Sequence, residues 1–174
     1  CNPCFVDIGL SLGKEKMYDY IEKFGYGKTT GVDFNGETSG MLVPESAVKN
    51  GDIARISFGQ TIAVTPLQLA CATAAAVNGG IYYEPYFVKD IYDKNGRIAE
   101  IMNPKAKRRV ISEEASRILA GYLEGVVRDG SGKQAYVAGY KVGGKTGTAQ
   151  KFENGVLSVG KNVMSFVGFF PANN

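Results

Sequence analysis

Apolar residues recur every three or four positions in three segments of this chain, which is the spacing of amphipathic helices. The first segment stops at Gly25, a residue typical of helix ends, and the second is apolar on almost every side, which indicates central burial. The third begins at Ser112, a suitable N-cap that two acidic residues follow. Helices are therefore predicted over residues 3–24, 67–77 and 112–127.

Strand patterns occupy much of the remaining chain. Residues 81–103 are expected to form a hairpin around the turn-forming cluster Asp93-Lys94-Asn95-Gly96. A glycine-interrupted alternating stretch over 136–150 and an almost continuous apolar stretch over 162–170 each predict a strand. Two strands do not form a stable sheet by themselves, so these two need further strands. Residues 25–52 have few periodic apolar positions and predict a long irregular segment.

The absence of histidine narrows the chemistry that this chain can perform. Its 174 residues include neither histidine nor tryptophan, so alone they cannot form a Ser-His-Asp triad, a Cys-His pair or a histidine-ligated metal site. Acid–base chemistry would fall to Lys, Tyr, Cys, Glu or Asp with a shifted pKa. The length, with 44% apolar and 21% charged residues, suits one globular domain or part of a larger one.

The charge pattern gives no support for nucleic acid binding. The net charge of +3 is small, and nucleotide-binding motifs are absent from the sequence. We interpret the one dense basic run, residues 105–109, as a solvated loop before a helix in preference to a polyanion site. No apolar run reaches the roughly 18 residues that a transmembrane helix needs.

The strongest chemical signal is the segment Lys145-Thr146-Gly147-Thr148 on the strand predicted over 136–150. A strand edge offers backbone N–H groups to a reacting carbonyl, and Gly147 permits a ligand to approach the backbone closely. Alternation places the hydroxyls of Thr146 and Thr148 on one face. Lys145 lies on the other face but can contribute a positive field to an anionic carboxylate.

Lys-Thr-Gly on a strand is one of three signature elements of penicillin-binding proteins and serine β-lactamases. With its flanks, the chain resembles the carboxyl-terminal portion of a class B penicillin-binding protein transpeptidase domain, and within that family it is most similar to the sporulation members. Four further stretches carry the resemblance in the family's order, beginning with the end of its Ser-x-Asn element: Cys1-Asn2-Pro3, Phe58–Ala70, Ala76–Gly80 and Met164–Ala172.

The resemblance implies an α/β (α+β) architecture of the penicillin-binding-protein and serine β-lactamase type. In this fold a five-stranded antiparallel sheet is flanked by helices. Residues 1–174 would form the carboxyl-terminal portion of one transpeptidase domain. The upstream segment that carries the nucleophile, and the last strand and helix, would lie outside these residues, so the fold would be incomplete here.

The family's mechanism assigns roles to residues of this chain by resemblance. A serine attacks the D-Ala-D-Ala carbonyl of a peptidoglycan stem peptide, an acyl-enzyme forms, and an amine of a neighbouring stem peptide accepts the acyl group. Asn2, Lys145 and Thr148 would be catalytic, with Asn2 orienting the substrate amide and the Thr148 N–H forming half of the oxyanion hole. Thr146, Gly147 and Thr148 would bind substrate, and Lys145, Thr146 and Thr148 would bind its carboxylate.

The nucleophile itself is not found at the place that the family's order requires. Ser-x-x-Lys occurs at Ser11, Ser46 and Ser158, but each of these follows Asn2 instead of preceding it. We interpret them as surface, loop and hairpin residues. The full domain is thus expected to be a serine-type D,D-transpeptidase, and the 174 residues alone are expected to be inactive and to fold poorly.

The resemblance also implies partners and a location. Peptidoglycan stem peptides and β-lactam antibiotics would be ligands, a membrane glycosyltransferase would be a partner, and no nucleic acid is expected. The parent protein would lie at the extracytoplasmic face of a bacterial membrane, anchored by an N-terminal segment. The alternative is a non-catalytic β-lactam sensor or scaffold of the same fold. A β-lactamase is a third interpretation, although Phe169-Phe170-Pro171-Ala172 resembles transpeptidases more.

The amino end carries a C-x-x-C pattern, Cys1-Asn2-Pro3-Cys4, with Asp7 one helical turn beyond Cys4. These side chains suggest up to three ligands, Cys1, Cys4 and Asp7, of a tetrahedral zinc site. A redox couple or a disulfide are further interpretations. We prefer two reduced cysteines at the start of a well-packed helix, and the mechanism above requires no cofactor. Cys71, on an apolar helix, is expected in the core.

Overall fold

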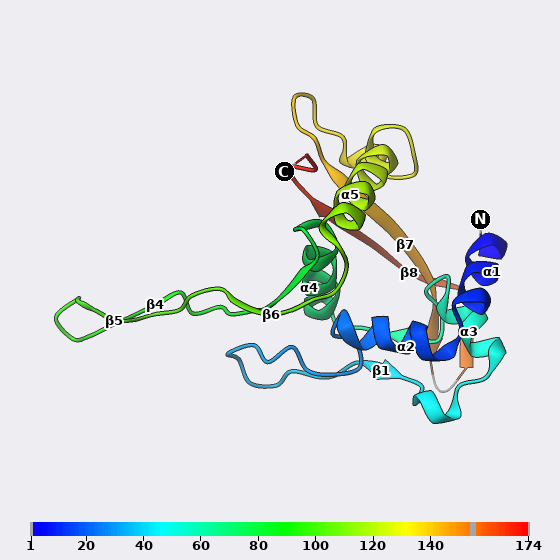
Figure 1. Ribbon diagram of the computed structural model, residues 1–174, viewed down its shortest axis with the longest axis horizontal. Coiled ribbons are helices and arrows are strands. Elements are labelled where there is room, and N and C mark those ends of the chain that lie inside the picture. The colour runs from blue at the N-terminus through cyan, green and yellow to red at the C-terminus, as the bar shows by residue number, and fades with distance from the viewer. Residues whose placement is uncertain (1, 154–155, 174) are drawn as a thin grey trace. The chain divides into compact units, whose positions relative to one another are not determined.

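The structure of this protein is a computed structural model that describes residues 2–153 and 156–173 (Figure 1). The chain divides into two compact units. The first unit comprises the chain up to Ala75 together with Ile81–Val110, and the second comprises Ala76–Gly80 and the chain from Ile111 onward. That residues 1–174 form one portion of a single transpeptidase domain stays a prediction.

The first unit begins with two helices where the sequence predicted one over residues 3–24. Helix α1 (Asn2–Leu12) ends and α2 (Lys14–Lys23) begins at Gly13, whose φ is 81°. Glycine reaches this left-handed conformation without steric cost, so the apolar periodicity continues while the backbone changes direction. Gly25, with a φ of 86°, follows α2 as predicted.

The predicted irregular segment over residues 25–52 contains short elements that the pattern did not reveal. Strand β1 (Met41–Leu42) pairs with β2 (Ile62–Ala63), and the 3₁₀ helix η1 (Glu45–Ala47) and helix α3 (Asn50–Ile56) follow β1 in the chain. Met17 and Tyr18 of α2 pack with Ile53 of α3 in a small core, and partly buried apolar residues surround it: Ile21, Leu42, Val48 and Ile56.

Helix α4 (Pro66–Val77) confirms the predicted second helix, and its start is fixed by a reciprocal cap. The Gln68 backbone N–H donates to the Thr65 hydroxyl at 3.1 Å, and the Thr65 N–H donates to the Gln68 side-chain oxygen at 2.8 Å. The Gln68 amide also donates to the backbone carbonyls of Lys28 and Ser39, at 2.8 and 2.9 Å. One buried side chain therefore joins the helix start to two points of the irregular segment.

A two-stranded ribbon completes the first unit (Figure 1). Strand β4 (Asp90–Tyr92) pairs with β5 (Ile98–Ile101) across the predicted turn, in which the Asp93 carboxylate accepts from two backbone N–H groups, so the hairpin is confirmed. Closer to the helices, β3 (Ile81–Glu84) pairs with β6 (Lys105–Arg109).

The position of β6 corrects the prediction that residues 105–109 form a solvated loop. Cross-strand partners stabilise this basic strand, because the Glu84 carboxylate on β3 forms ion pairs with Lys105 and Lys107. Arg108 stacks over the Tyr82 ring, with 4.2 Å between the guanidinium carbon and the ring centroid.

The same arginine caps helix α2 from a distant part of the chain. Arg108 donates from Nε to the Lys23 carbonyl at 2.7 Å and from Nη2 to the Glu22 carbonyl at 3.3 Å. These carbonyls belong to the last turn of the helix, whose dipole favours a cation, and the Glu22 carbonyl also accepts from the Gly25 N–H at 2.9 Å.

We therefore expect Arg108→Ala to lower the free energy of unfolding of the full-length protein's domain by about 2 kcal/mol. Arg108→Lys should recover less than half of this loss, because an ammonium cannot reproduce the planar fork. Denaturant unfolding measures both values. Arg97→Ala in the exposed hairpin turn is the matched control and should change stability by less than about 0.5 kcal/mol. Equal stability of the Arg108→Ala variant and the parent protein would contradict the capping role.

The second unit joins one helix to a long antiparallel pair of strands. Helix α5 (Glu113–Arg128) begins as predicted, because the Ser112 hydroxyl accepts from the Ala115 N–H at 3.1 Å. After the short 3₁₀ helix η2 (Lys133–Ala135), strand β7 (Gly143–Glu153) pairs with β8 (Val156–Phe169), and α5 packs against β7. Within the described ranges, no helix combines the length and the apolar character that crossing a membrane requires.

The start of β7 corrects the predicted strand boundary at residue 136. Residues before Gly143 form turns instead, since Gly139 has a φ of 84° and the Tyr140 N–H donates to the Val137 carbonyl at 3.1 Å. A positive φ and a local hydrogen bond both interrupt an extended ladder. The alternating pattern over these residues is therefore not that of a strand.

Candidate functional site

The predicted Lys-Thr-Gly segment lies on β7, opposite the apolar strand β8. No register shift interrupts the pairing between Gly143 and Gln150, so side chains alternate regularly through the segment. Thr146 and Thr148 therefore share one face of the strand, as predicted, and Lys145 lies on the other. Among the described residues, β8 is the one strand that pairs with β7, so the other edge of β7 is open to a ligand.

Glycines bring β7 close to the side chains of β8. A Cβ on Gly144 would lie 2.5 Å from Cζ of Phe166 and 2.7 Å from the Val167 carbonyl oxygen. A Cβ on Gly147 would lie 2.5 Å from the Ser165 hydroxyl oxygen. At Gly144 a side chain would meet a backbone carbonyl that cannot move aside, so glycine is required there for packing, whereas at Gly147 rotation of the Ser165 hydroxyl could relieve the contact.

Ser131, in the glycine-rich turn after α5, reaches the site from outside the strand. The Ser131 hydroxyl lies 3.1 Å from the Thr146 hydroxyl oxygen. The turn folds back tightly on α5, because the N–H groups of Gly130 and Gly132 both donate to the Val126 carbonyl, at 3.1 and 3.0 Å. Glycines on both sides of an exposed serine were the signal available in the sequence, but its target on β7 depends on the tertiary fold.

Lys145 supplies the positive charge of the Lys-Thr-Gly segment. Its side chain is exposed, and its ammonium donates to the Thr146 carbonyl at 2.7 Å. Within the described ranges, no carboxylate forms an ion pair with it. Although Lys145 lies on the other face of β7, its ammonium reaches the Thr146 carbonyl at the strand edge, so its charge acts beside the hydroxyls of Ser131, Thr146 and Thr148. This set of donors is suited to an anionic group next to a carbonyl that becomes negatively charged during reaction.

The remaining member of the predicted catalytic set belongs to the first unit. Asn2 is exposed in the first turn of α1, whereas Lys145 and Thr148 lie on β7 in the second unit. The structure thus brings together Lys145, Thr146, Gly147 and Thr148, and adds Ser131 to them. The role of Asn2 stays a prediction.

The suggested metal ligands lie at the start of α1. Cys1 lies outside the described residues, while Cys4 and Asp7 are exposed one helical turn apart. In the described part of the chain, no three histidine, cysteine, aspartate or glutamate residues are grouped so that they could hold a metal ion. The zinc site therefore stays a prediction that depends on Cys1. Cys71 on α4 is half-buried, and burial raises the pKa of its thiol.

Comparisons with a family model and with known proteins point to the same protein family. The family model described as the penicillin binding protein transpeptidase domain matches residues 1–174. Stage V sporulation protein D of Bacillus subtilis is 46% identical over 175 residues, which cover 100% of this chain and 27% of that protein. This chain therefore spans about a quarter of that relative's length.

Solved structures agree with this result. Penicillin binding protein 3 of Mycobacterium tuberculosis, complexed with ampicillin, superposes with a TM-score of 0.90 at 30% identity, over 97% of this chain and 39% of that one. The D,D-transpeptidase domain of a peptidoglycan glycosyltransferase from Eggerthella lenta gives a TM-score of 0.84 at 27% identity, over 98% and 43% of the two chains. The fold class predicted from the sequence is confirmed.

Proposed function

Because this chain belongs to the penicillin binding protein transpeptidase domain family, we propose that it forms part of a serine-type peptidoglycan D,D-transpeptidase. The enzyme cross-links stem peptides through an acyl-enzyme during cell-wall or spore-cortex synthesis, and β-lactams inhibit it. The observation that carries this proposal is the open edge of β7, where Lys145, Thr146 and Thr148 gather donors for a carboxylate and a carbonyl.

The residues of β7 have separate roles in this chemistry. The Lys145 ammonium and the hydroxyls of Thr146 and Thr148 bind the terminal carboxylate of the D-Ala-D-Ala substrate. The Thr148 N–H polarises the scissile carbonyl and stabilises the oxyanion as the serine oxygen bonds to its carbon. The serine hydroxyl gives up its proton, the C–N bond to the last D-alanine breaks, and that proton leaves on the amine of D-alanine. The amine of a neighbouring stem peptide then takes the acyl group from the serine, and a proton from this amine returns to the serine oxygen. Asn2 orients the substrate amide, and a Ser-x-x-Lys element outside residues 1–174 supplies the nucleophile.

Fluorescent penicillin labelling of the protein at its full natural length tests the proposal. We expect one penicillin per molecule, and release of D-alanine from a stem pentapeptide when an amine acceptor is present. The isolated 174 residues should remain unlabelled. A full-length protein that takes up no penicillin would contradict the proposal. A protein that is labelled but releases no D-alanine would instead be the non-catalytic sensor or scaffold of the same fold.

Ser131 provides a finer test of the same site. Since its hydroxyl lies 3.1 Å from that of Thr146, Ser131→Ala removes a hydrogen bond that positions the carboxylate-binding threonine. We expect the rate of acylation by benzylpenicillin to fall about fivefold. Ser131→Thr keeps the hydroxyl and should retain the parent rate within about twofold. Acylation of the alanine variant at the parent rate would mean that Ser131 does not position Thr146.

The partners and the location follow from the same proposal. Stem peptides and β-lactams are its ligands, a membrane glycosyltransferase is its partner, and the extracytoplasmic face of a bacterial membrane is its place of action. The names of the similar proteins, with ampicillin bound in one and a glycosyltransferase in another, support these assignments. Acyl transfer through a serine requires no cofactor. Elemental analysis of the intact protein tests zinc separately, and a metal-free protein would remove the Cys1, Cys4 and Asp7 site.

A further inference from the structure

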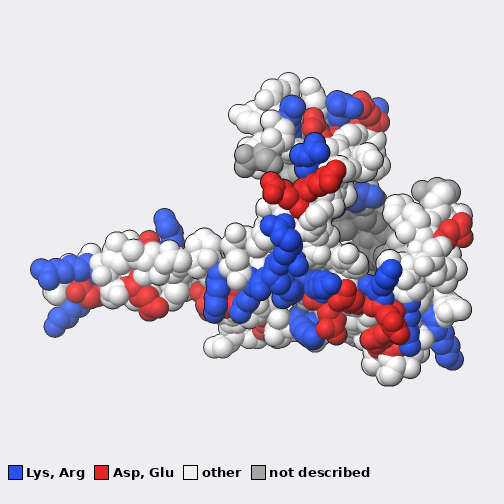
Figure 2. All heavy atoms as spheres, viewed as in Figure 1, with Lys and Arg blue, Asp and Glu red and all other residues white. Residues whose placement is uncertain are grey.

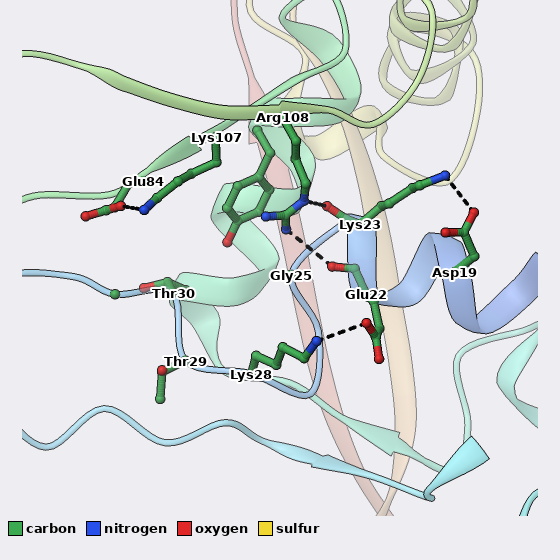
Figure 3. A pocket seen from close by; sticks show the side chains of 12 residues that line it. Asp19, Glu22, Lys23, Gly25, Lys28, Thr29, Thr30, Glu84, Lys107 and Arg108 are labelled. Atoms are coloured by element: carbon green, nitrogen blue, oxygen red, sulfur yellow. Dashed lines mark hydrogen bonds and ion pairs between the residues drawn. The ribbon is translucent and has the colours of Figure 1, made fainter. Parts of the chain in front are cut away.

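A charged cavity in the first unit shares no residue with the strand β7. Its volume is about 590 Å³, which is within the range of small-molecule sites. The end of α2, the loop that follows it and the strands β3 and β6 form its walls (Figure 3). Figure 2 shows basic and acidic side chains gathered side by side over α2 and β6.

The charges that line the charged cavity are paired through exposed contacts. Lys28 binds Glu22 at 2.9 Å and Lys23 binds Asp19 at 2.6 Å, while Lys107 binds Glu84. The lysine side chains in these pairs are at least 40% exposed. In the Lys23 and Lys28 pairs both partners are exposed, so these ion pairs contribute little to stability and either ammonium can turn toward a carboxylate of a ligand at small cost. Lys107 keeps its partner Glu84, which is only 24% exposed, but an ammonium has three N–H donors and can bind a ligand beside that carboxylate.

Arg108 is the fixed cation of the charged cavity. Its guanidinium is held by the Tyr82 ring and by the two carbonyls at the end of α2. These two hydrogen bonds use two of the five N–H donors of a guanidinium, so donors remain for a ligand. Because the side chain is already ordered, a ligand does not have to immobilise it on binding.

The charged cavity also carries a small excess of positive charge. Four cations line it against three carboxylates, namely Lys23, Lys28, Lys107 and Arg108 against Asp19, Glu22 and Glu84. In Figure 3, Lys28 and Arg108 approach Glu22 from two sides, at its carboxylate and at its backbone carbonyl. Thr29 adds an exposed hydroxyl to the same wall. The lining is therefore suited to a polar ligand that bears carboxylates beside hydrogen-bonding amides.

We propose that the charged cavity is a second binding site for a carboxylate-bearing stem peptide of peptidoglycan. The inference rests on the proposed function, which identifies peptidoglycan as the polymer that carries the stem peptide. A second stem peptide held here would keep the peptidoglycan polymer on the enzyme between acyl transfers. Binding of one stem peptide raises the effective concentration of another stem peptide on the same polymer. Lys28, Lys107 and Arg108 bind its free carboxylates.

Binding of a soluble disaccharide–pentapeptide to the full-length protein tests this site. The protein is first acylated with benzylpenicillin, which blocks the site on β7, and the peptide is then titrated by calorimetry. We expect saturable binding that Lys28→Gln combined with Lys107→Gln weakens about tenfold. Lys94→Gln combined with Arg97→Gln in the hairpin turn removes the same charge elsewhere and should leave the binding unchanged. The same peptide with its carboxyl groups amidated should also bind about tenfold more weakly.

Three results would overturn the proposal: no binding to the acylated protein, equal binding by the Lys28/Lys107 double variant and the parent, or equal binding of the amidated peptide. Acylation by penicillin is measured first on every variant, so loss of folding is seen separately. If the parent protein is not acylated, the proposed function fails, and the charged cavity is still tested by the same titrations of the unmodified protein.

Discussion

Replacing Lys145 by alanine in the full-length protein is expected to lower the rate of acylation by benzylpenicillin at least about 100-fold. In the described part of the chain no carboxylate forms an ion pair with this ammonium, which donates a hydrogen bond to the Thr146 carbonyl. Its charge is thus available to the carboxylate of the ligand. Removing the charge leaves hydroxyls and backbone N–H groups, which hold an anion less strongly and position its carbonyl less well.

The rate is measured under pseudo-first-order conditions over a range of penicillin concentrations. Lys141→Ala is the matched control, because Lys141 is an exposed lysine shortly before β7. It should retain the parent rate within about twofold. A Lys145→Ala variant that reacts as fast as the Lys141→Ala control would show that the ammonium takes no part, and the assignment of β7 as the substrate strand would be lost.

The sequence revealed this strand because its chemistry is contiguous. Lys145, Thr146, Gly147 and Thr148 follow one another, and the alternation of a strand then decides which of them share a face. Ser131 lies fifteen positions from Thr146, and nothing local indicates that the two hydroxyls meet. That contact depends on how the turn after α5 folds back onto Val126, which is a property of the tertiary structure.

The errors in the predicted secondary structure also come from features that the local sequence does not show. Apolar periodicity continues through Gly13, so the break between α1 and α2 could be recognised only from the φ of that glycine. The basic run over residues 105–109 has the composition of a solvated loop. It is a strand because Glu84 and Tyr82 on β3 supply partners for its cations. In both cases the backbone conformation or the tertiary contacts outweighed the secondary-structure preference of the local sequence.

Gln68 is a polar residue in an apolar helix, and its side chain connects this helix to two points of the irregular segment. The prediction that the helix over residues 67–77 is centrally buried followed from its apolar residues, which left Gln68 unexplained. The structure shows it 1% exposed, with its side chain bound to Thr65, Lys28 and Ser39. Buried polar side chains are retained where every donor and acceptor is satisfied, and here the two donors of the amide have separate carbonyl partners.

We therefore expect Gln68→Leu to lower the free energy of unfolding by about 3 kcal/mol. Leucine has a similar volume, so the loss comes from the part-buried backbone carbonyls of Lys28 and Ser39 and the N–H of Thr65, which would lose their hydrogen-bond partner. Urea unfolding of the full-length protein's domain measures the change. The matched control is Gln134→Leu, since Gln134 is exposed in the second unit, and it should shift stability by less than about 0.5 kcal/mol.

Two results separate this explanation from a simple change in packing at position 68. Gln68→Met, which is also close in volume, should destabilise the domain as much as Gln68→Leu, because neither side chain can donate to Lys28 or Ser39. Amide exchange at Thr65 should accelerate in both variants, since its N–H loses the acceptor that now protects it. If either variant were as stable as the parent protein, the carbonyls would have found other partners, and Gln68 would not be what holds the irregular segment on α4.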